Sequence, residues 1–377
     1  MTGRPLVFVW ENFGPYHVDR TEAVARANGG ARPVVGLELR ERSVDYSWDS
    51  ASSALFKKIT LSKAGERLGL LSKLGRLMSA ARVAGRGDYF LCHYHYAEMF
   101  LFAIWLRLTG SRAFAMFESK FDDRPRRLWQ EVIKSWLFMP YNGALYGSPR
   151  SREYLRFLGF HDRRLASGYD AVSVERIRLS SGSEIAPGGV AFSERDFVSV
   201  ARLVEKKNLR VLIHAYAQYA AAVVDPRGLK LLGDGPLEAE LKDLAVHLGV
   251  ADKVTFRGFV QTAEVAHVLS NSLALLLPSI EEQFGLVVIE AMALGLPVVV
   301  SDNVGARDEL VRSQVNGFVV EPDNVEGLAR AMVALSGDEG RWAGMCRNST
   351  ELVSAGDVAR FAEGVARLAG GAAPVRP

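Results

Sequence analysis

Short apolar runs alternate with longer stretches of helical period along most of the chain. The runs that predict strands are LVFVW, PVVGLEL, DYFLCH, RAFAMF and GALYGS in the first half, and DFVSVAR, LKLLG, KVTFRG, LALLLPS, PVVVSD and NGFVVEP in the second. Between them, residues 208–222 and 237–248 repeat their apolar positions with the period of an α-helix. This alternation predicts an α/β protein with two doubly wound parallel sheets, each covered by helices on both faces.

A segment rich in serine and glycine, LSSGSEIAPGG at residues 179–189, interrupts the periodic pattern. Because 377 residues exceed the size of one ordinary core, we expect two domains that meet at this segment. The predicted N-terminal domain covers residues 1–180 and the predicted C-terminal domain covers residues 181–354. A last amphipathic helix within residues 355–377 is expected to pack back onto the N-terminal domain.

Charge is distributed unevenly between the two halves. Residues 1–180 contain 28 Lys and Arg against 18 Asp and Glu, whereas the remaining residues contain 18 against 25, so the halves are expected to meet different partners. The two cysteines, Cys92 and Cys346, have no metal-ligand spacing and fit a reducing compartment. The first apolar run is too short for a signal peptide, and MFLFAIWL is too short to span a bilayer. We therefore expect a cytoplasmic protein, at most peripheral on the inner face of the cell membrane.

Residues 55–87 form the most basic stretch, with eight Lys and Arg and one acidic residue. Leu68, Leu71, Leu74 and Met78 recur there at helical spacing, which predicts a basic amphipathic helix. Such a helix could rest on an anionic membrane surface, draw in an anionic acceptor, or pack into the core with a basic outer face. No nucleic-acid-binding motif accompanies the charge, so nucleic acid is not an expected partner.

The segment VARLVEKKN places Arg202 just after a predicted strand and Lys207 five residues further on, where a helix opens. The first N–H groups of a helix lack intrahelical partners and attract anions, and Arg and Lys beside them favour a diphosphate. A solvated helix cap is the alternative. The turn GDGP at residues 233–236 does not follow the G-x-G-x-x-G pattern, so a dinucleotide fingerprint is not satisfied. Gly258 ends another predicted strand, and the adjacent Phe259 could pack on a base or belong to the core.

The segment PSIEEQFGLVVIEAMALGLPVVVSD carries two glutamates, Glu282 and Glu290, on either side of Gly285. Glu282 falls in the loop after a strand, and Gly285 leads a helix that holds Glu290 in its early turns. A favourable interaction with the helix dipole at the N-terminus would explain one glutamate, but it gives no reason for the second. We expect both carboxylates to face one crevice, about a nucleotide sugar's length apart.

These segments resemble a known family. EEQFGLVVIEAMALGLPVVVSD resembles the E-x7-E signature of retaining GT-B glycosyltransferases, closest to glycosyltransferase family 4, the glycosyl transferases group 1. ARLVEKKN resembles the family's G-R-L-x-x-x-K element, with Ala201 where glycine is usual, and SDNVGARDELVRSQVNGFVVEPDN resembles the segment that follows the signature. The resemblance covers roughly residues 195–335, and ASGYDAVS at residues 166–173 extends it weakly.

The resemblance implies a GT-B fold, in which two Rossmann-like doubly wound domains face each other across a cleft. It also implies a retaining enzyme that moves a hexose-type sugar from a nucleotide-diphosphate sugar, UDP- or GDP-linked, to the hydroxyl of a glycan, a lipid-linked or a small-molecule acceptor. Another nucleotide-sugar enzyme, such as an epimerase or hydrolase, and a non-catalytic nucleotide-sugar-binding subunit are the alternatives. The chain has no D-x-D triplet, because Asp122 and Asp123 are adjacent, so we expect no metal and no cofactor.

Roles follow from the resemblance position by position. The implied catalytic residues are Arg202, Lys207, Glu282 and His95, with Arg202 and Lys207 on the diphosphate and Glu282 on the donor sugar. Glu290 would bind the ribose, and the helix start at Leu286 and Val287 the departing phosphate. The remaining donor contacts would come from Gly14, Gly258, Phe259, Val260, Phe284 and Gly285.

Acceptor candidates lie in the N-terminal half. His17 follows the first strand, and His93 and His95 follow another, so one of this pair is expected to face the cleft, with His95 favoured. Glu118 and Lys120 follow a third strand, where they could recognise the acceptor or belong to a solvated, salt-bridged loop.

Overall fold

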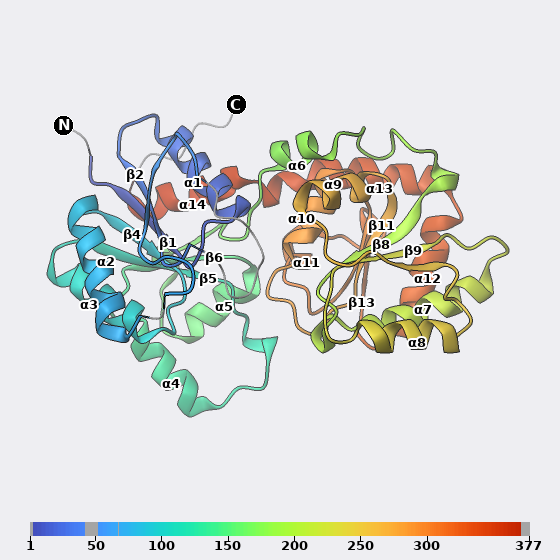
Figure 1. Ribbon diagram of the computed structural model, residues 1–377, viewed down its shortest axis with the longest axis horizontal. Helices are drawn as coiled ribbons and strands as arrows, with labels where there is room; N and C mark the ends of the chain where they lie inside the picture. Colours follow the sequence, from blue (N-terminus) through green and yellow to red (C-terminus); the bar gives the residue numbers. More distant parts are fainter. Residues whose placement is uncertain (1–2, 42–51, 67, 371–377) are drawn as a thin grey trace. The chain divides into compact units, whose positions relative to one another are not determined.

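A computed structural model describes residues 3–41, 52–66 and 68–370 of the chain. The chain divides into two compact units, each built on a parallel sheet with helices on its faces (Figure 1). The first unit runs to Ser173, except for Asp122–Arg124, and takes up the chain again at Val358. The second unit holds Val174–Asp357 together with Asp122–Arg124.

The sheet of the first unit has the strand order β3-β2-β1-β4-β5-β6-β7, and all its pairings are parallel. Its strands are β1 (Leu6–Trp10), β2 (Val34–Glu38), β3 (Lys57–Thr60), β4 (Asp88–Leu91), β5 (Arg112–Phe117), β6 (Gly143–Tyr146) and β7 (Leu165–Ser167). Its helices are α1 (Pro15–Asn28), α2 (Leu70–Ala84), α3 (Ala97–Leu108), α4 (Leu128–Leu137), α5 (Pro149–Phe157) and α14 (Val358–Ala369).

Strand β1 shows how this sheet buries both faces. Val7 and Val9 join a core with residues of α2, α3 and α5, whereas Phe8 and Trp10 join a second core with residues of α1 and α14. Successive side chains of a strand point to opposite faces, so a strand covered by helices on both sides is apolar throughout. This explains why the predicted run LVFVW coincides with β1.

The second sheet has the order β10-β9-β8-β11-β12-β13, also parallel. Its strands are β8 (Asp196–Val200), β9 (Leu229–Leu232), β10 (Val254–Phe256), β11 (Ser272–Leu277), β12 (Val298–Ser301) and β13 (Gly317–Val320). The helices of this unit are α6 (Val174–Ser181), α7 (Leu209–Ala222), α8 (Glu238–His247), α9 (Thr262–Ser270), α10 (Leu286–Ala293), α11 (Arg307–Leu310), α12 (Val325–Ser336) and α13 (Glu339–Leu352).

The boundaries between the units differ from the predicted ones. Helix α6 packs against α9 and α10, with Ile177 buried, so the second unit begins before the predicted boundary at residue 180. Helix α14 packs on α1, β6 and β7 of the first unit. The close approach depends on Gly364, where a Cβ would lie 2.3 Å from the Ser167 carbonyl oxygen.

The predicted basic amphipathic helix over residues 55–87 is confirmed only for part of the stretch, where α2 lies. The stretch contains the edge strand β3 and, after a loop, the helix α2. The buried stripe of α2 is Leu77, Ala80 and Ala81, whereas Leu71 is 81% exposed. Two of the predicted apolar positions, Leu74 and Met78, are partly buried and pack against the same core, and the two lysines of β3 suit a strand at the edge of a sheet.

Among the described helices, none combines the length and apolar character that crossing a membrane requires.

Candidate functional site

Each sheet has one point where the direction of strand addition reverses. In the second unit the chain runs from β8 outward to β9 and β10 and then returns to β11 on the other side of β8. Ligands of open parallel sheets bind outside the carboxyl ends of the strands at such a point. The loops that meet there carry Arg202 and Lys207 after β8, and Glu282 and Gly285 after β11. The structure therefore brings together two predicted donor residues, Lys207 and Glu282, that lie 75 positions apart in the sequence.

Lys207 and Glu282 form an ion pair, in which Lys207 Nζ donates to Glu282 Oε2. The two side chains are only 15% and 16% exposed. Ser279 Oγ donates to the same carboxylate oxygen at 3.3 Å. Because a lysine ammonium has three donors, its bond to Glu282 fixes the cation in place and leaves donor capacity for a phosphate oxygen.

Hydrogen bonds connect the two loops that carry Lys207 and Glu282. The Ile280 N–H donates to the Lys206 carbonyl at 2.8 Å, which ties the loop after β11 to the start of α7. Asn208, in the left-handed conformation at φ 57°, donates through Nδ2 to the carbonyls of Pro278 at 3.1 Å and Pro322 at 2.6 Å. Asparagine is among the few side chains that tolerate this backbone conformation. Sequence reasoning did not predict that Asn208 links these loops.

Gly285 begins α10 with a positive φ of 94°, and an added Cβ would lie 3.3 Å from Glu282 Cγ. The first N–H groups of the helix, at Leu286 and Val287, lie just beyond the Lys207–Glu282 pair in the chain and have no intrahelical acceptors. Both residues are partly buried. The residue before them, Phe284, is 4% exposed and its carbonyl accepts from the Ala306 N–H at 2.9 Å. The helix start thus lies next to Glu282 and offers N–H groups of the kind that attract anions.

Glu290 is the fifth residue of α10 and is 4% exposed. Burying a carboxylate costs free energy unless it is paired or hydrogen-bonded, so a glutamate at this position needs polar partners. The expectation that Glu282 and Glu290 contact the two ends of one ligand remains a prediction.

The loops after β8, β9 and β10 are joined by backbone contacts. Gly233 N–H donates to the Gly258 carbonyl at 2.8 Å, and Leu203 N–H donates to the Asp234 carbonyl at 2.7 Å. Gly258 has a φ of 67° at the carboxyl end of β10. Phe259 is 47% exposed, which excludes the alternative of a core side chain, and Val260 is partly exposed.

In the first unit the corresponding reversal lies between β1 and β4. Gly14 precedes α1, and its N–H donates to His17 Nδ1 at 3.3 Å. Burial, together with the nearby charges of Arg20 and His93, lowers the pKa of His17 to about 3. His17 is therefore a neutral imidazole near pH 7 and does not act there as a cation for phosphate.

Of the two histidines after β4, His93 is the one whose charge affects His17. Its φ is 54°, and its ring stacks on Tyr96 with centroids 5.0 Å apart. His95 is exposed, with its ring 5.9 Å from that of His93. The structure thus places His93, rather than the favoured His95, beside the loop after β1.

Glu118 and Lys120 follow β5. The Glu118 carbonyl accepts from Ser151 Oγ at 2.8 Å, and the Lys120 carbonyl accepts from Arg126. Lys120 is 1% exposed, so the alternative of a solvated loop does not describe it.

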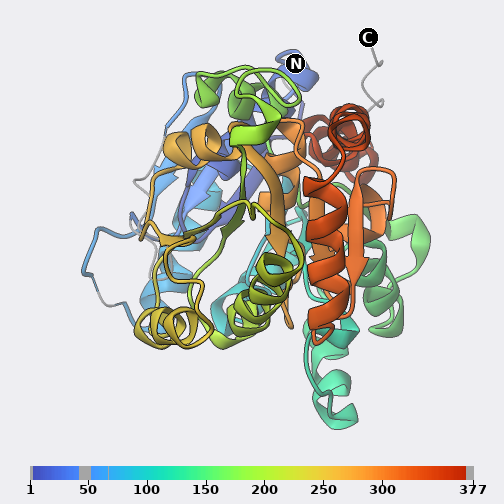
Figure 2. The same ribbon diagram turned by 90° about the vertical axis from the view of Figure 1, so that its right-hand side faces the viewer.

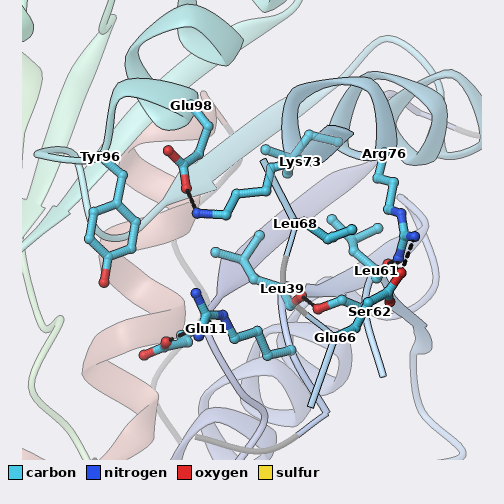
Figure 3. A pocket seen from close by; sticks show the side chains of 12 residues that line it. Glu11, Leu39, Leu61, Ser62, Glu66, Leu68, Lys73, Arg76, Tyr96 and Glu98 are labelled. Atoms are coloured by element: carbon cyan, nitrogen blue, oxygen red, sulfur yellow. Dashed lines mark hydrogen bonds and ion pairs between the residues drawn. The ribbon is translucent and has the colours of Figure 1, made fainter. Parts of the chain in front are cut away.

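A pocket that the sequence did not predict lies at the carboxyl ends of β1, β2 and β3, against α2 and α3 (Figure 3). Three ion pairs line it: Lys73 Nζ lies 2.8 Å from Glu98 Oε1, Arg76 Nη1 2.8 Å from Glu66 Oε2, and Arg40 Nε 3.9 Å from Glu11 Oε1. Leucines and Tyr96 complete its wall. Glu11 comes directly after β1, and that position was the one available indication in the sequence.

The charge in this pocket is balanced, because each lining cation has a carboxylate partner. Burial alone would raise the pKa of Glu98, but the hydrogen bond from Lys73, a backbone hydrogen bond and the charges of Lys73 and Arg40 together lower it. The pocket therefore offers charged hydrogen-bonding groups without a net charge.

Comparisons with known proteins agree with this geometry. Residues 185–351 match the family model described as glycosyl transferases group 1. Over 143 residues the chain is 36% identical to an uncharacterized glycosyltransferase of Methanocaldococcus jannaschii, covering 37% of this chain and 35% of that protein. Over 171 residues it is 34% identical to a putative colanic acid biosynthesis glycosyltransferase of Salmonella typhimurium, covering 44% and 41%. The matched segment thus spans well under half the length of these relatives.

The fold is shared over a longer range. The structure of Anabaena HepE in complex with UDP and glucose superposes with a TM-score of 0.69 at 17% identity, covering 97% of this chain and 98% of that one. The predicted α/β class with two Rossmann-like units of GT-B type is confirmed.

Proposed function

We propose, from the match of residues 185–351 to the glycosyl transferases group 1 family, that the protein is a glycosyltransferase that uses a nucleotide-diphosphate sugar. The observation that carries the proposal is the Lys207–Glu282 pair at the reversal point of the second sheet, next to the start of α10. A partly buried cation and a helix N-terminus at one place suit a diphosphate, and a carboxylate beside them suits sugar hydroxyls. HepE, which shares the fold, was solved with UDP and glucose, and this supports a donor of the same class.

In the proposed reaction the bond between the anomeric carbon and the diphosphate oxygen breaks, and its electron pair stays on the diphosphate. The acceptor oxygen bonds to the anomeric carbon, and its proton passes to the leaving phosphate. Negative charge grows where Lys207, Arg202 and the N–H groups of Leu286 and Val287 can receive it, so the site is preorganised for the transition state. Retention of configuration, a hexose donor and independence from divalent metal are parts of the proposal that rest on the E-x7-E spacing and on these cations.

Donor binding provides the first test. We expect one nucleotide among UDP, GDP, ADP and TDP, or its sugar, to raise the thermal unfolding midpoint, since a ligand at about 100 times its Kd stabilises the folded state by about 2.7 kcal/mol. The shift should persist in EDTA. The variant E290Q should lose most of it, because a buried carboxylate contact is removed without a change in shape.

The matched control for this test is E281Q, which alters a carboxylate of the β11 loop that is partly exposed. A shift that is equal in E290Q and the unaltered protein would contradict the role of Glu290. No shift with any nucleotide would contradict the proposed donor class.

An acceptor-free assay separates the alternatives. An epimerase or hydrolase would turn over the nucleotide sugar as fast without an acceptor as with one. A non-catalytic binding subunit would show the thermal shift and no turnover with any acceptor extract. The proposed transferase requires an acceptor for rapid release of the nucleotide diphosphate.

The charge-balanced pocket of the first unit supports a neutral, hydroxyl-bearing acceptor, such as a sugar, over a phosphorylated one. Charged donors and acceptors that are already paired can hydrogen-bond hydroxyl groups, and Leu39, Leu61 and Tyr96 offer apolar surface for the C–H faces of a sugar ring. Each of the three cations lining the pocket has a carboxylate partner, so the pocket has no excess positive charge that would favour a phosphate over a neutral hydroxyl.

The variant E98Q tests this acceptor site. We expect the KM for the acceptor found in an extract screen to rise about tenfold, as the loss of one charged hydrogen bond implies. The slow acceptor-free hydrolysis of the donor should stay unchanged, because the second unit is untouched. E22Q, which breaks an exposed pair with Arg26 on α1, is the control. Equal loss of transfer and hydrolysis in E98Q would argue against an acceptor site.

A further inference from the structure

Helix α4 presents its apolar side chains to solvent. Six residues of α4 and the turn after it are between 47% and 72% exposed: Leu128, Trp129, Val132, Ile133, Trp136 and Met139. We call these six residues the α4 patch. They recur at the spacing of one helix face. In Figures 1 and 2 the helix, drawn in turquoise-green, extends from the sheet of its own unit.

The opposite face of α4 is charged and buried. Glu131 is 4% exposed and accepts a hydrogen bond from the Tyr154 hydroxyl, to which Lys134 Nζ donates at 2.6 Å. Arg126 Nη1 lies 3.8 Å from the same carboxylate and its guanidinium lies over the Tyr154 ring, 4.7 Å from the centroid. A surface helix ordinarily has the reverse arrangement, with apolar residues inward and charges outward. The buried ion cluster anchors α4 and fixes the patch as the outward face.

We propose that the α4 patch inserts into the interface of an anionic lipid bilayer. Tryptophan favours the boundary between headgroups and acyl chains, and the patch has two, Trp129 and Trp136. Arg127, exposed at the N-cap, stands at one end of the patch, and Arg107, which donates to the Met139 carbonyl at 3.0 Å, stands at the other. The single carboxylate of α4, Glu131, points away. Basic residues around an exposed apolar face complement anionic headgroups.

This assignment differs from the membrane contact that the sequence suggested for residues 55–87. On α2, Lys73 and Arg76 are paired with Glu98 and Glu66, and they line the pocket described above. Their charge is therefore already compensated. The proposal for α4 does not depend on the proposed enzymatic activity, since it rests on the first unit alone.

Sedimentation of the full chain with vesicles tests the proposal. The unaltered protein should bind vesicles of equimolar phosphatidylcholine and phosphatidylglycerol, and bind phosphatidylcholine alone at least about tenfold more weakly. The double variant W129S/W136S should lose about tenfold or more of the affinity for anionic vesicles, because it removes the two indole rings that become buried in the bilayer interface on binding. The tryptophan emission of the unaltered protein should shift to shorter wavelength on binding, and this shift should vanish in the double variant.

The control V224S removes a fully exposed apolar side chain in the second unit and should bind vesicles normally. The thermal midpoint shows whether each variant is folded, and the single variants W129S and W136S serve if the double variant is not. Undiminished vesicle binding in folded W129S/W136S would overturn the proposal. It would also be overturned by a concentration-dependent dimer, seen by light scattering, that this variant abolishes while vesicles bind neither protein.

Discussion

Replacing Lys207 by alanine should lower the rate of sugar transfer by about 10²–10³-fold, the usual effect of removing one preorganised group that faces developing charge. Glu282 holds the ammonium in place before any ligand binds, so the loss of side-chain entropy on ordering Lys207 occurs during folding and not during the reaction. Loss of the cation also leaves the Glu282 carboxylate, which is 16% exposed, without its partner and beside the incoming phosphate. The measurement is the initial rate of nucleotide diphosphate release with saturating donor and acceptor.

Lys206 gives a matched control for this variant. It is the adjacent lysine and is exposed, and its recorded contacts with the β11 loop use the backbone carbonyl alone. K206A should keep nearly the full rate, and both variants should keep the thermal midpoint within a few degrees. Equal losses in K206A and K207A would show that net charge and not the paired cation matters. Full activity in K207A would show that the paired cation has no role in the transfer.

The strands of both units could be predicted because most are buried on two faces. Strand β11 reads SLALLL and is buried at every position, so its composition alone identifies it. The edge strand β3, KKIT, could not be identified in this way, because its side chains are exposed or partly exposed and two of them are lysines. The error over residues 55–87 has the same origin, since an edge strand and a half-exposed helix both lack a continuous apolar run.

The site was predictable where its residues lie close together in the chain. The loop after β11 and the start of α10 form one segment, so the spacing of Glu282, Gly285 and Glu290 could be read directly. The bond between Lys207 and Glu282 depends on β8 and β11 being neighbours, which strand order decides. The pocket of the first unit combines side chains from β1, β2, β3, α2 and α3, and no local pattern could place them together.

The packing of the β8 and β9 loops leads to the second large effect. Gly233 has a φ of 129°, and a Cβ on this residue would lie 2.1 Å from the Ala201 carbonyl oxygen. The loop cannot retreat easily, because Gly233 N–H is bonded to the Gly258 carbonyl and Ala201 N–H to the Leu232 carbonyl. We therefore expect G233A to reduce the free energy of unfolding by about 3 kcal/mol or more, from overpacking and backbone strain together.

The variant G249A separates the clash from the backbone strain. Gly249 has a φ of 70° after α8 of the same unit, but a Cβ there meets no atom within 4 Å. G249A should cost about 1 kcal/mol, the strain of a left-handed conformation alone, and should leave the donor-induced thermal shift intact. G233A should also weaken that shift, because moving the β8 loop displaces Arg202 and the start of α7. Equal destabilisation of the two variants would show that the loops adapt, and that their contact does not hold the donor site in shape.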